Sequence, residues 1–359
     1  MRRELLSIML LLCIIVFVVS AEEKPPRKAP PLPDVAVHSL GPQKLAPLPP
    51  VPVPPDNPQT PMKILLGKQL YFDTRLSADN NESCASCHDP AMGWSDKGPT
   101  SVGIKSQVGP RRAPPVSNSA YMPLQFWDGR ADTLEEQAKG PIINPKEMGN
   151  THEKMLETLN SIPGYVEEFE TVFGKIPIDL DQVAKAIAAY ERTIVTTDSP
   201  FDRYAKGDKT ALTPLEAQGL EIFNGKGHCT ACHWGPNFTD GRFHNLGAKN
   251  KEPMEDDLGR YAVTKNDKDK RAFKTPTVRD VASRPPYLHN GSEQTLWDLV
   301  EFYNRGGGDD DSNMDPLMVP LGLTKGEMEA LVAFMKVAVT SNNPEVANEK
   351  PIPPDEFPK

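Results

Sequence analysis

The chain has 359 residues, 38% of them hydrophobic, and a formal net charge of −9. This acidic balance argues against nucleic acid as a partner, because phosphate groups bind to basic surfaces. The same charge would suit a basic protein partner, but ordinary solubility is the more common meaning of charge alone. The length leaves room for two domains of ordinary size.

The first 21 residues are predicted to be an export signal. Arg2 and Arg3 precede an apolar run over residues 5–19, and residues 19–21 fit a small-residue cleavage site. The run is short for a membrane span, so cleavage after Ala21 is favoured over an uncleaved anchor. We expect a periplasmic protein that is held at a membrane only if the leader stays uncleaved.

Residues 22–62 form a proline-rich segment that contains 14 of the 38 prolines. Such a composition favours extended polyproline II and cannot pack a hydrophobic core. The sequence therefore predicts a disordered arm, followed by the first folded domain from residue 63.

Two Cys-x-x-Cys-His motifs, at residues 84–88 and 229–233, use four of the five cysteines, and the fifth lies in the leader. This motif is the attachment signature of a c-type haem: two thiolates bind the vinyl groups, and the histidine becomes an iron ligand. A zinc cluster is disfavoured, since its ligands rarely occur as two copies of this motif. We expect two covalently bound haems, held by Cys84, Cys87 and His88 and by Cys229, Cys232 and His233.

Helical patterns dominate the rest of the chain, and no long alternating stretch indicates a strand. Helices are predicted over residues 64–72, 133–138, 152–159, 183–194, 213–223, 294–303 and 325–339. The predicted fold is mainly α, with few short strands and two cytochrome c-like haem domains packed against each other. The N-terminal haem domain is assigned to residues 63–205, the C-terminal one to 206–345, and a tail to 346–359.

Six short segments support a more specific interpretation. They read LGKQLYFD at 66–73, QFWDGR at 125–130, LEEQA at 134–138, NPKEM at 144–148, FKTPTVR at 273–279 and PYLHNG at 286–291. With these segments the chain resembles the bacterial di-haem cytochrome c peroxidases, and especially their MauG-like branch, from about residue 66 to residue 339.

The resemblance implies roles for individual residues. His88 and His233 match the proximal iron ligands, and Trp127 matches the tryptophan between the two haems. Gln137 and Glu147 match the polar pair over the N-terminal haem. A carboxyl group at this place can move a proton between the two peroxide oxygens, which is general acid–base catalysis.

The axial positions depart from the usual peroxidase pattern. Ile104 stands where many peroxidases carry a histidine ligand, so the N-terminal haem is expected to be five-coordinate. Tyr303 stands where they carry a methionine, as in the MauG-like branch, and a phenolate favours ferric and higher oxidation states. Met314 and Met318 remain alternative ligands of the second haem.

The calcium site of the family is also altered. Arg112 takes the place of its asparagine ligand, and Arg284 lies near the carbonyl donors. Calcium needs oxygen ligands, and guanidinium groups repel it. We expect calcium to bind weakly or not at all.

These features together predict a periplasmic di-haem peroxidase or oxidase. It would reduce hydrogen peroxide at the N-terminal haem and share the oxidising power with the second haem through Trp127. The donor would be a small cytochrome c, a cupredoxin, or a side chain of a protein substrate as for MauG. The alternative is a non-catalytic electron-transfer cytochrome in which strong ligands close both haems.

Overall fold

The computed structural model describes residues 44–248, 256–308 and 313–341, and parts of the segment from 346 to 359. The expected leader and its cleavage site lie outside the described residues. Within the described residues, no helix has both the length and the apolar character needed to cross a membrane.

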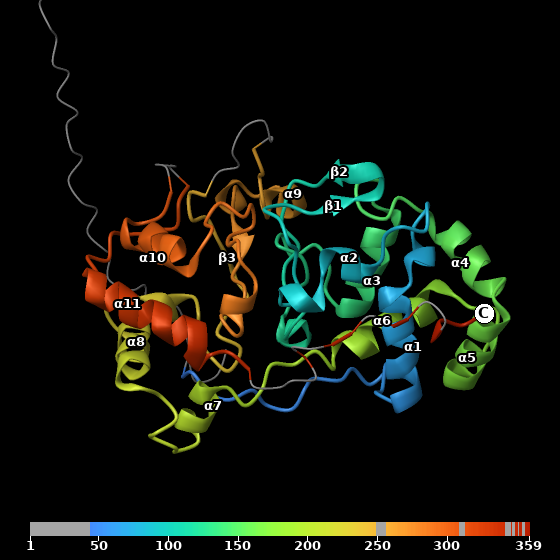
Figure 1. The fold of residues 1–359 in the computed structure, drawn as a ribbon. Helices are drawn as coiled ribbons and strands as arrows, with labels where there is room; N and C mark the ends of the chain where they lie inside the picture. The colour runs from blue at the N-terminus through green and yellow to red at the C-terminus, as the bar shows by residue number, and fades with distance from the viewer. Residues whose placement is uncertain are drawn as a thin grey trace, which may run out of the picture.

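The described chain forms two mainly helical domains that lie side by side (Figure 1). The N-terminal domain contains the helices α1 (Pro61–Phe72), α2 (Cys84–Cys87), α3 (Leu134–Ile143), α4 (His152–Asn160), α5 (Pro163–Phe173) and α6 (Leu180–Glu191), and the antiparallel strands β1 (Val102–Gly103) and β2 (Gln107–Val108).

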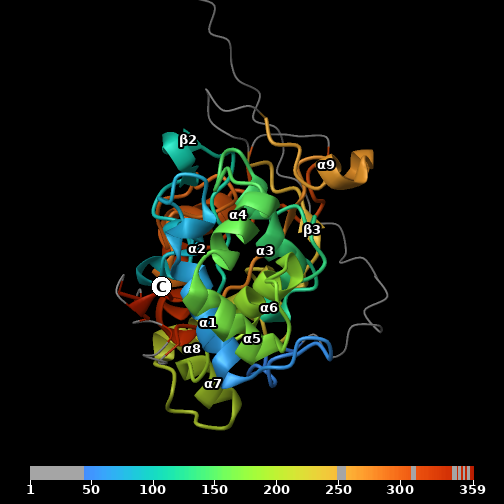
Figure 2. The ribbon, with the colours of Figure 1, turned by 90° about the vertical axis from the view of Figure 1, so that its right-hand side faces the viewer.

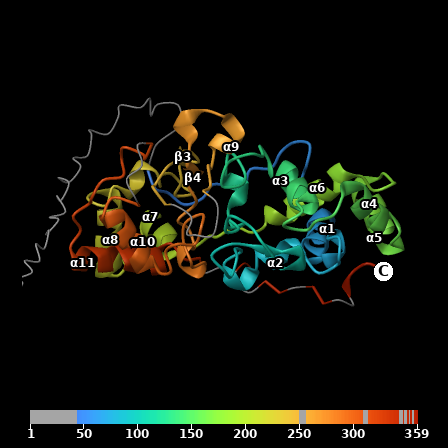
Figure 3. The same ribbon diagram turned by 90° about the horizontal axis from the view of Figure 1, so that it is seen from above.

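The C-terminal domain has a similar make-up. It contains α7 (Pro200–Ala205), α8 (Pro214–Asn224), α9 (Tyr261–Thr264), α10 (Leu296–Asn304) and α11 (Lys325–Ala333), which continues as a π-helix (Phe334–Ala338), and the antiparallel strands β3 (Phe243–His244) and β4 (Phe273–Lys274). Seen from above, the two domains follow one another along the long direction of the molecule (Figure 3). The predicted mainly α fold with few short strands is confirmed.

One close crossing of helices organises each core. In the N-terminal domain α1 packs on α6, and in the C-terminal domain α8 packs on α11. The view along the first domain shows α1, α5 and α6 grouped together (Figure 2). Both crossings depend on a glycine: a methyl group on Gly67 would overlap the carbonyl of Ala186, and one on Gly219 would overlap that of Ala330.

Capping residues explain why the predicted helices begin where they do. Thr133 accepts a hydrogen bond from the backbone N–H of Glu136 at the start of α3, and Thr213 forms a capping box with Glu216 at the start of α8. The sequence did not predict α5, because its first residues are Pro and Gly, which are also typical of a turn.

The expected disordered arm differs from the structure over residues 44–62. Leu45 is buried in the C-terminal core, and α1 already begins at Pro61. Asn57 is fully buried in the N-terminal domain, where its side-chain amide donates to Glu135 at 2.7 Å. Extended proline-rich backbone leaves its carbonyls unpaired, and the Pro49 carbonyl accepts a bond from the Tyr121 hydroxyl. Residues 44–62, called the strap below, therefore contact both domains.

The boundary between the domains also falls earlier than predicted. Phe201 of α7 belongs to the C-terminal core, and Asp202 is paired with the buried Arg279 at 2.8 Å. These contacts assign α7 to the second domain, which begins at about residue 200 rather than 206.

The described part of the tail returns to the N-terminal domain, where Figure 1 shows the C-terminus beside α5. Val346 is buried in the N-terminal core, and its carbonyl accepts a hydrogen bond from the Trp94 indole at 3.0 Å. Phe357 packs against the same core. The two ends of the described chain therefore both bridge the domains.

Candidate active site and haem pockets

A cavity in the N-terminal domain brings together the residues predicted for the first haem. Its lining includes Cys87, His88, Trp127, Gln137 and Glu147. These side chains come from α2, α3 and the loops around them, so separate parts of the sequence converge only in the folded chain. Of the three residues of the first motif expected to hold the haem, only Cys84 is absent from the lining, and it packs on the N-terminal core.

Glu147 lies in this cavity, and among the described residues its carboxylate has one hydrogen-bond partner. The side-chain amide of Asn144 donates to its Oε1 at 2.7 Å. Burial raises the pKa of Glu147, while the positive charge of Arg130 and the bond from Asn144 act against the rise. A carboxyl group whose pKa is shifted toward neutrality can both accept and return a proton. Sequence reasoning did not single out Asn144 or Arg130.

Ile104 supports the loop that carries Glu147. Its side chain is buried, with 4% exposed, and lies against Gly149. Its backbone N–H donates to the Glu147 carbonyl at 2.8 Å. An isoleucine side chain has no atom that can bind iron, and at this position it packs instead.

The imidazole of His88 is buried, and the charges of Asp96 and Arg112 act on it in opposite directions. Burial lowers the pKa of His88, which keeps its ring neutral, as an iron ligand must be. The Tyr71 hydroxyl donates to the His88 carbonyl at 3.1 Å and helps to fix the backbone next to the ring.

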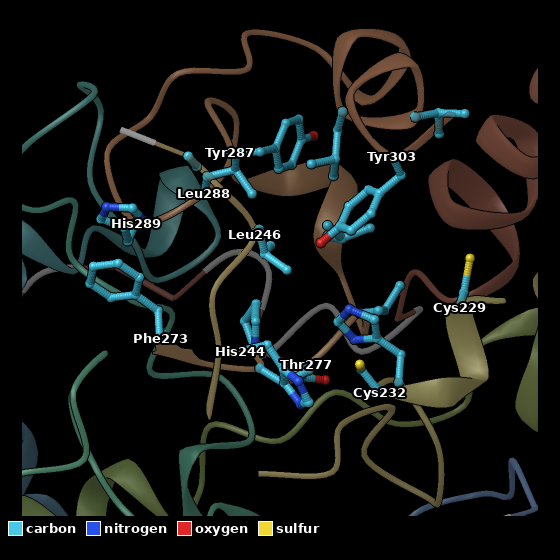
Figure 4. Close-up of a pocket in the computed structure, with 18 of the residues that line it drawn as sticks. Cys229, Cys232, His244, Leu246, Phe273, Thr277, Tyr287, Leu288, His289 and Tyr303 are labelled. Carbon is cyan, nitrogen blue, oxygen red and sulfur yellow. The ribbon is translucent and has the colours of Figure 1, made fainter. Parts of the chain in front are cut away.

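A second cavity, in the C-terminal domain, gathers the residues of the second motif. Cys229, Cys232, His233 and Tyr303 line it, and the Tyr303 hydroxyl points into the cavity (Figure 4). Nδ1 of His233 faces the Phe238 carbonyl at 3.0 Å, so Nε2 is left for a metal. Burial raises the pKa of Tyr303.

Of the alternative ligands, Met318 also lines this second cavity, whereas Met314 is not part of its lining. Among the described residues, none of the four motif cysteines forms a disulfide. Each cavity thus offers thiols and a neutral imidazole at its wall, and these residues fit a covalently bound haem.

Trp127 lines both cavities. Its indole N–H donates to the Arg112 carbonyl at 2.8 Å, and its own carbonyl accepts a bond from the backbone N–H of Lys274 at 2.8 Å. The edge of the indole also meets the His289 ring, with centroids 6.5 Å apart. Contacts from both domains therefore hold this one aromatic ring at their boundary.

Comparison with known proteins identifies the family. A family model described as di-haem cytochrome c peroxidase matches residues 61–210. Cytochrome-c peroxidase IdrP1 of Pseudomonas sp. (strain SCT) is 38% identical, over 87% of this chain and 89% of that protein. The chain belongs to the di-haem cytochrome c peroxidase family.

Other relatives place the chain near MauG as well. Methylamine utilization protein MauG of Methylorubrum extorquens is 41% identical, over 79% of this chain and 80% of that protein. A solved MauG-like protein associated with microbial copper homeostasis matches with a TM-score of 0.76 and 28% identity, over 84% of this chain and 95% of that one. Membership of this family makes the chain a haem-containing oxidoreductase of the peroxidase type, with peroxide and redox proteins as partners.

Arg112 occupies the place where the family resemblance puts a calcium ligand. Its guanidinium donates to the carbonyls of Gly98, Pro285 and Arg284, the last two at 3.1 and 3.4 Å. The side chain is buried, with 3% exposed. The guanidinium of Arg112 therefore already provides these carbonyl oxygens with a positively charged partner.

Three titratable residues of the pockets were not foreseen from the sequence. His244 lies in the C-terminal cavity between Asp240 and Asp315, at 2.9 and 2.6 Å. Lys274 lines the same cavity, and Glu191 lines the N-terminal one. For Glu191 a signal existed, because it follows Ile187 by one helical turn on the apolar face of its helix.

Proposed function

We propose that this chain reduces hydrogen peroxide in the N-terminal haem pocket and draws electrons from a protein donor through the C-terminal haem and Trp127. One asymmetry supports the proposal most directly. Among the described residues that line the N-terminal cavity, His88 is the only histidine, and no methionine or tyrosine joins it. The C-terminal cavity offers Tyr303 and Met318 in addition to His233. An iron held there by His88 alone would be accessible to peroxide.

The haem, when bound, supplies the iron and the electrons for cleavage of the peroxide bond, and protein groups supply the proton transfer. The net reaction consumes two electrons and two protons for each peroxide and yields two water molecules. Asn144 holds Oε1 of Glu147, so we assign to Oε2 the transfer of a proton from one peroxide oxygen to the other. Gln137 borders the same cavity, and its amide can orient peroxide by hydrogen bonds.

For the cofactors, we propose thioether bonds from Cys84 and Cys87 to the first haem, and from Cys229 and Cys232 to the second. Tyr303 would hold the iron of the C-terminal haem together with His233, because its hydroxyl points into that cavity. Trp127 is assigned to electron transfer between the haems, because it borders both cavities.

Calcium is proposed to be dispensable. The Arg112 guanidinium already binds three carbonyl oxygens, and a divalent cation at the same oxygens would meet its charge.

The electron source is proposed to be a redox protein of the periplasm. A small cytochrome c or a cupredoxin would fit the peroxidase relatives, and a protein side chain would fit the MauG relative. Periplasmic location rests on the apolar leader and on haem attachment, which takes place outside the cytoplasm.

The spectrum of the ferric holoprotein tests the proposal. We expect one high-spin haem, assigned to the N-terminal site, and one low-spin haem, and we expect peroxide to alter the high-spin signal at once. Steady-state turnover with reduced cytochrome c or cupredoxin then distinguishes a peroxidase from a protein that oxidises a side chain. Two low-spin haems that do not respond to peroxide would identify a non-catalytic cytochrome.

The ligand of the second haem is tested with a matched pair of variants. Tyr303→Phe keeps the ring and removes the phenol oxygen, so the low-spin signal should change while the high-spin signal stays. Met318→Leu removes the thioether at nearly constant volume and should leave both signals unchanged. The reverse pattern would assign the ligand to Met318.

A further inference from the structure

Lys274 is a buried cation in the wall of the C-terminal haem cavity. It lies on β4, only 7% of it is exposed, and it lines the cavity together with Tyr303 and His233. Burial lowers the pKa of Lys274 to about 8. Among the described residues, no carboxylate lies close enough to offset this loss of hydration.

The other cations of this cavity are already paired. Arg284 donates to the carbonyls of Arg279 and Thr277 at 2.7 and 2.6 Å. Arg271 forms an ion pair with Asp256 at 2.6 Å, and Arg112 binds carbonyls as described above. Lys274 differs from all three, since its ammonium has no such partner within the described parts of the chain.

A buried ammonium without a partner is costly, because an apolar cavity does not replace its water shell. The cost is removed when an anion enters the same space. The ligand that this cavity fits is a haem, whose two propionates are carboxylates. A lysine is well suited to this pairing, because its flexible stem can bring the charge to the anion.

We propose that Lys274 is the anion-binding residue of the C-terminal pocket and pairs with a propionate of the haem held by Cys229 and Cys232. The inference rests on the proposed function only in assuming that this cavity holds a haem. Because the Lys274 backbone is bonded to that of Trp127, the pair would lie at the boundary with the N-terminal domain.

The pair has a measurable consequence. A fixed positive charge near the haem favours the reduced iron, which carries one positive charge less than the oxidised iron. Lys274 should therefore raise the reduction potential of the C-terminal haem. The N-terminal haem, in the other cavity, should be much less affected.

The test is a spectroelectrochemical titration of the di-haem holoprotein. Lys274→Met should make reduction of the C-terminal haem about tenfold less favourable, a fall of ~59 mV for one electron. Lys274→Arg keeps the charge and should stay close to the wild type. Lys270→Met removes an equal charge four residues away, from a side chain that is 46% exposed, and should change neither haem.

Two results would overturn the inference. One is that the C-terminal haem has the same reduction potential in Lys274→Met as in Lys270→Met. The other is that Lys274→Met shifts the reduction potentials of both haems equally. If Lys274→Met is isolated without its C-terminal haem, haem content decides. If Lys274→Arg then keeps both haems, the result supports an anion-binding role for Lys274. If Lys274→Arg also loses the C-terminal haem, the result contradicts that role. These readouts need no peroxide, so a failure of the peroxidase proposal would be recognised separately.

Discussion

At the scale of single residues, Glu147 gives the sharpest test of the chemistry. Glu147→Gln preserves the size of the side chain and its contact with Asn144, but it removes the group that can accept a proton. We expect kcat/KM for peroxide to fall by about 10²–10⁴, the usual contribution of a general acid–base group.

The matched control is Glu136→Gln, an exposed carboxylate on α3 near Gln137. It should leave turnover unchanged, and both variants should keep two haems and the ferric spectrum of the wild type. Unchanged peroxide turnover in Glu147→Gln would remove this residue from the mechanism.

Glu191 predicts a pH dependence of stability. Its carboxyl is 5% exposed, and burial raises its pKa from 4.5 to about 8, against the opposing charge of Arg192. Between these two values the folded chain holds a proton that the unfolded chain has released. Stability from this group is therefore complete below pH 4.5 and is lost as the pH rises through 8.

Glu191→Gln removes this titration. The free energy of unfolding, measured by denaturant titration at several pH values, should fall less steeply in the variant from pH 5 to 8, by up to roughly 1.4 kcal/mol per pH unit. The exposed Glu136→Gln should keep the slope of the wild type. Equal slopes in all three proteins would show that Glu191 does not hold its proton in this range.

At the scale of elements, the two helix crossings should be intolerant of even one added methyl group. In Gly67→Ala or Gly219→Ala the new methyl would meet a backbone carbonyl of the facing helix, which cannot rotate away. We expect each change to lower the free energy of unfolding by about 1–3 kcal/mol.

Gly326→Ala is the control, because Gly326 lies in α11 with nothing within 4 Å of the new methyl. It should stabilise the protein by about 0.5–1 kcal/mol, since alanine loses less backbone entropy than glycine. Thermal unfolding of the holoproteins compares the three. If Gly67→Ala or Gly219→Ala left the thermal stability unchanged, the two helices at that crossing would not be in the close contact described.

At the scale of the whole molecule, the tail (346–359) follows the C-terminal domain and packs on the N-terminal one. Phe357 packs on the N-terminal core, and the Arg75 guanidinium lies over its ring, 5.8 Å from the centroid. Phe357→Ala should destabilise the N-terminal domain by about 1–3 kcal/mol, less than for a fully buried phenylalanine. Lys350→Ala, at an exposed tail position, should stay within about 0.5 kcal/mol of the wild type. Hydrogen exchange should show that the backbone amides of α1 and α5 are less protected in Phe357→Ala than in Lys350→Ala. Equal protection in the two variants would contradict the role of Phe357.

Much of this molecule can be predicted from local sequence. The haem motifs, the helix of Val183 and Ile187, and the proline-led start of α8 all depend on spacing within a few residues. The strap and the tail could not be predicted in this way. Their contacts, such as Leu45 in the C-terminal core and Val346 in the N-terminal core, join residues far apart in the chain.

The sequence by itself determined the haem cofactor through the spacing of the Cys-x-x-Cys-His motifs, and it indicated the family through six short segments. Both signals depend on neighbouring residues. Only the tertiary structure decided which groups share a cavity. In the folded chain, Glu147 and His88 line the same cavity, and Trp127 lines both cavities. Lys274 lines the mainly apolar C-terminal cavity. The reason is physical: burial and electrostatic partners depend on packing between distant segments, and these set proton affinities and the binding of anions.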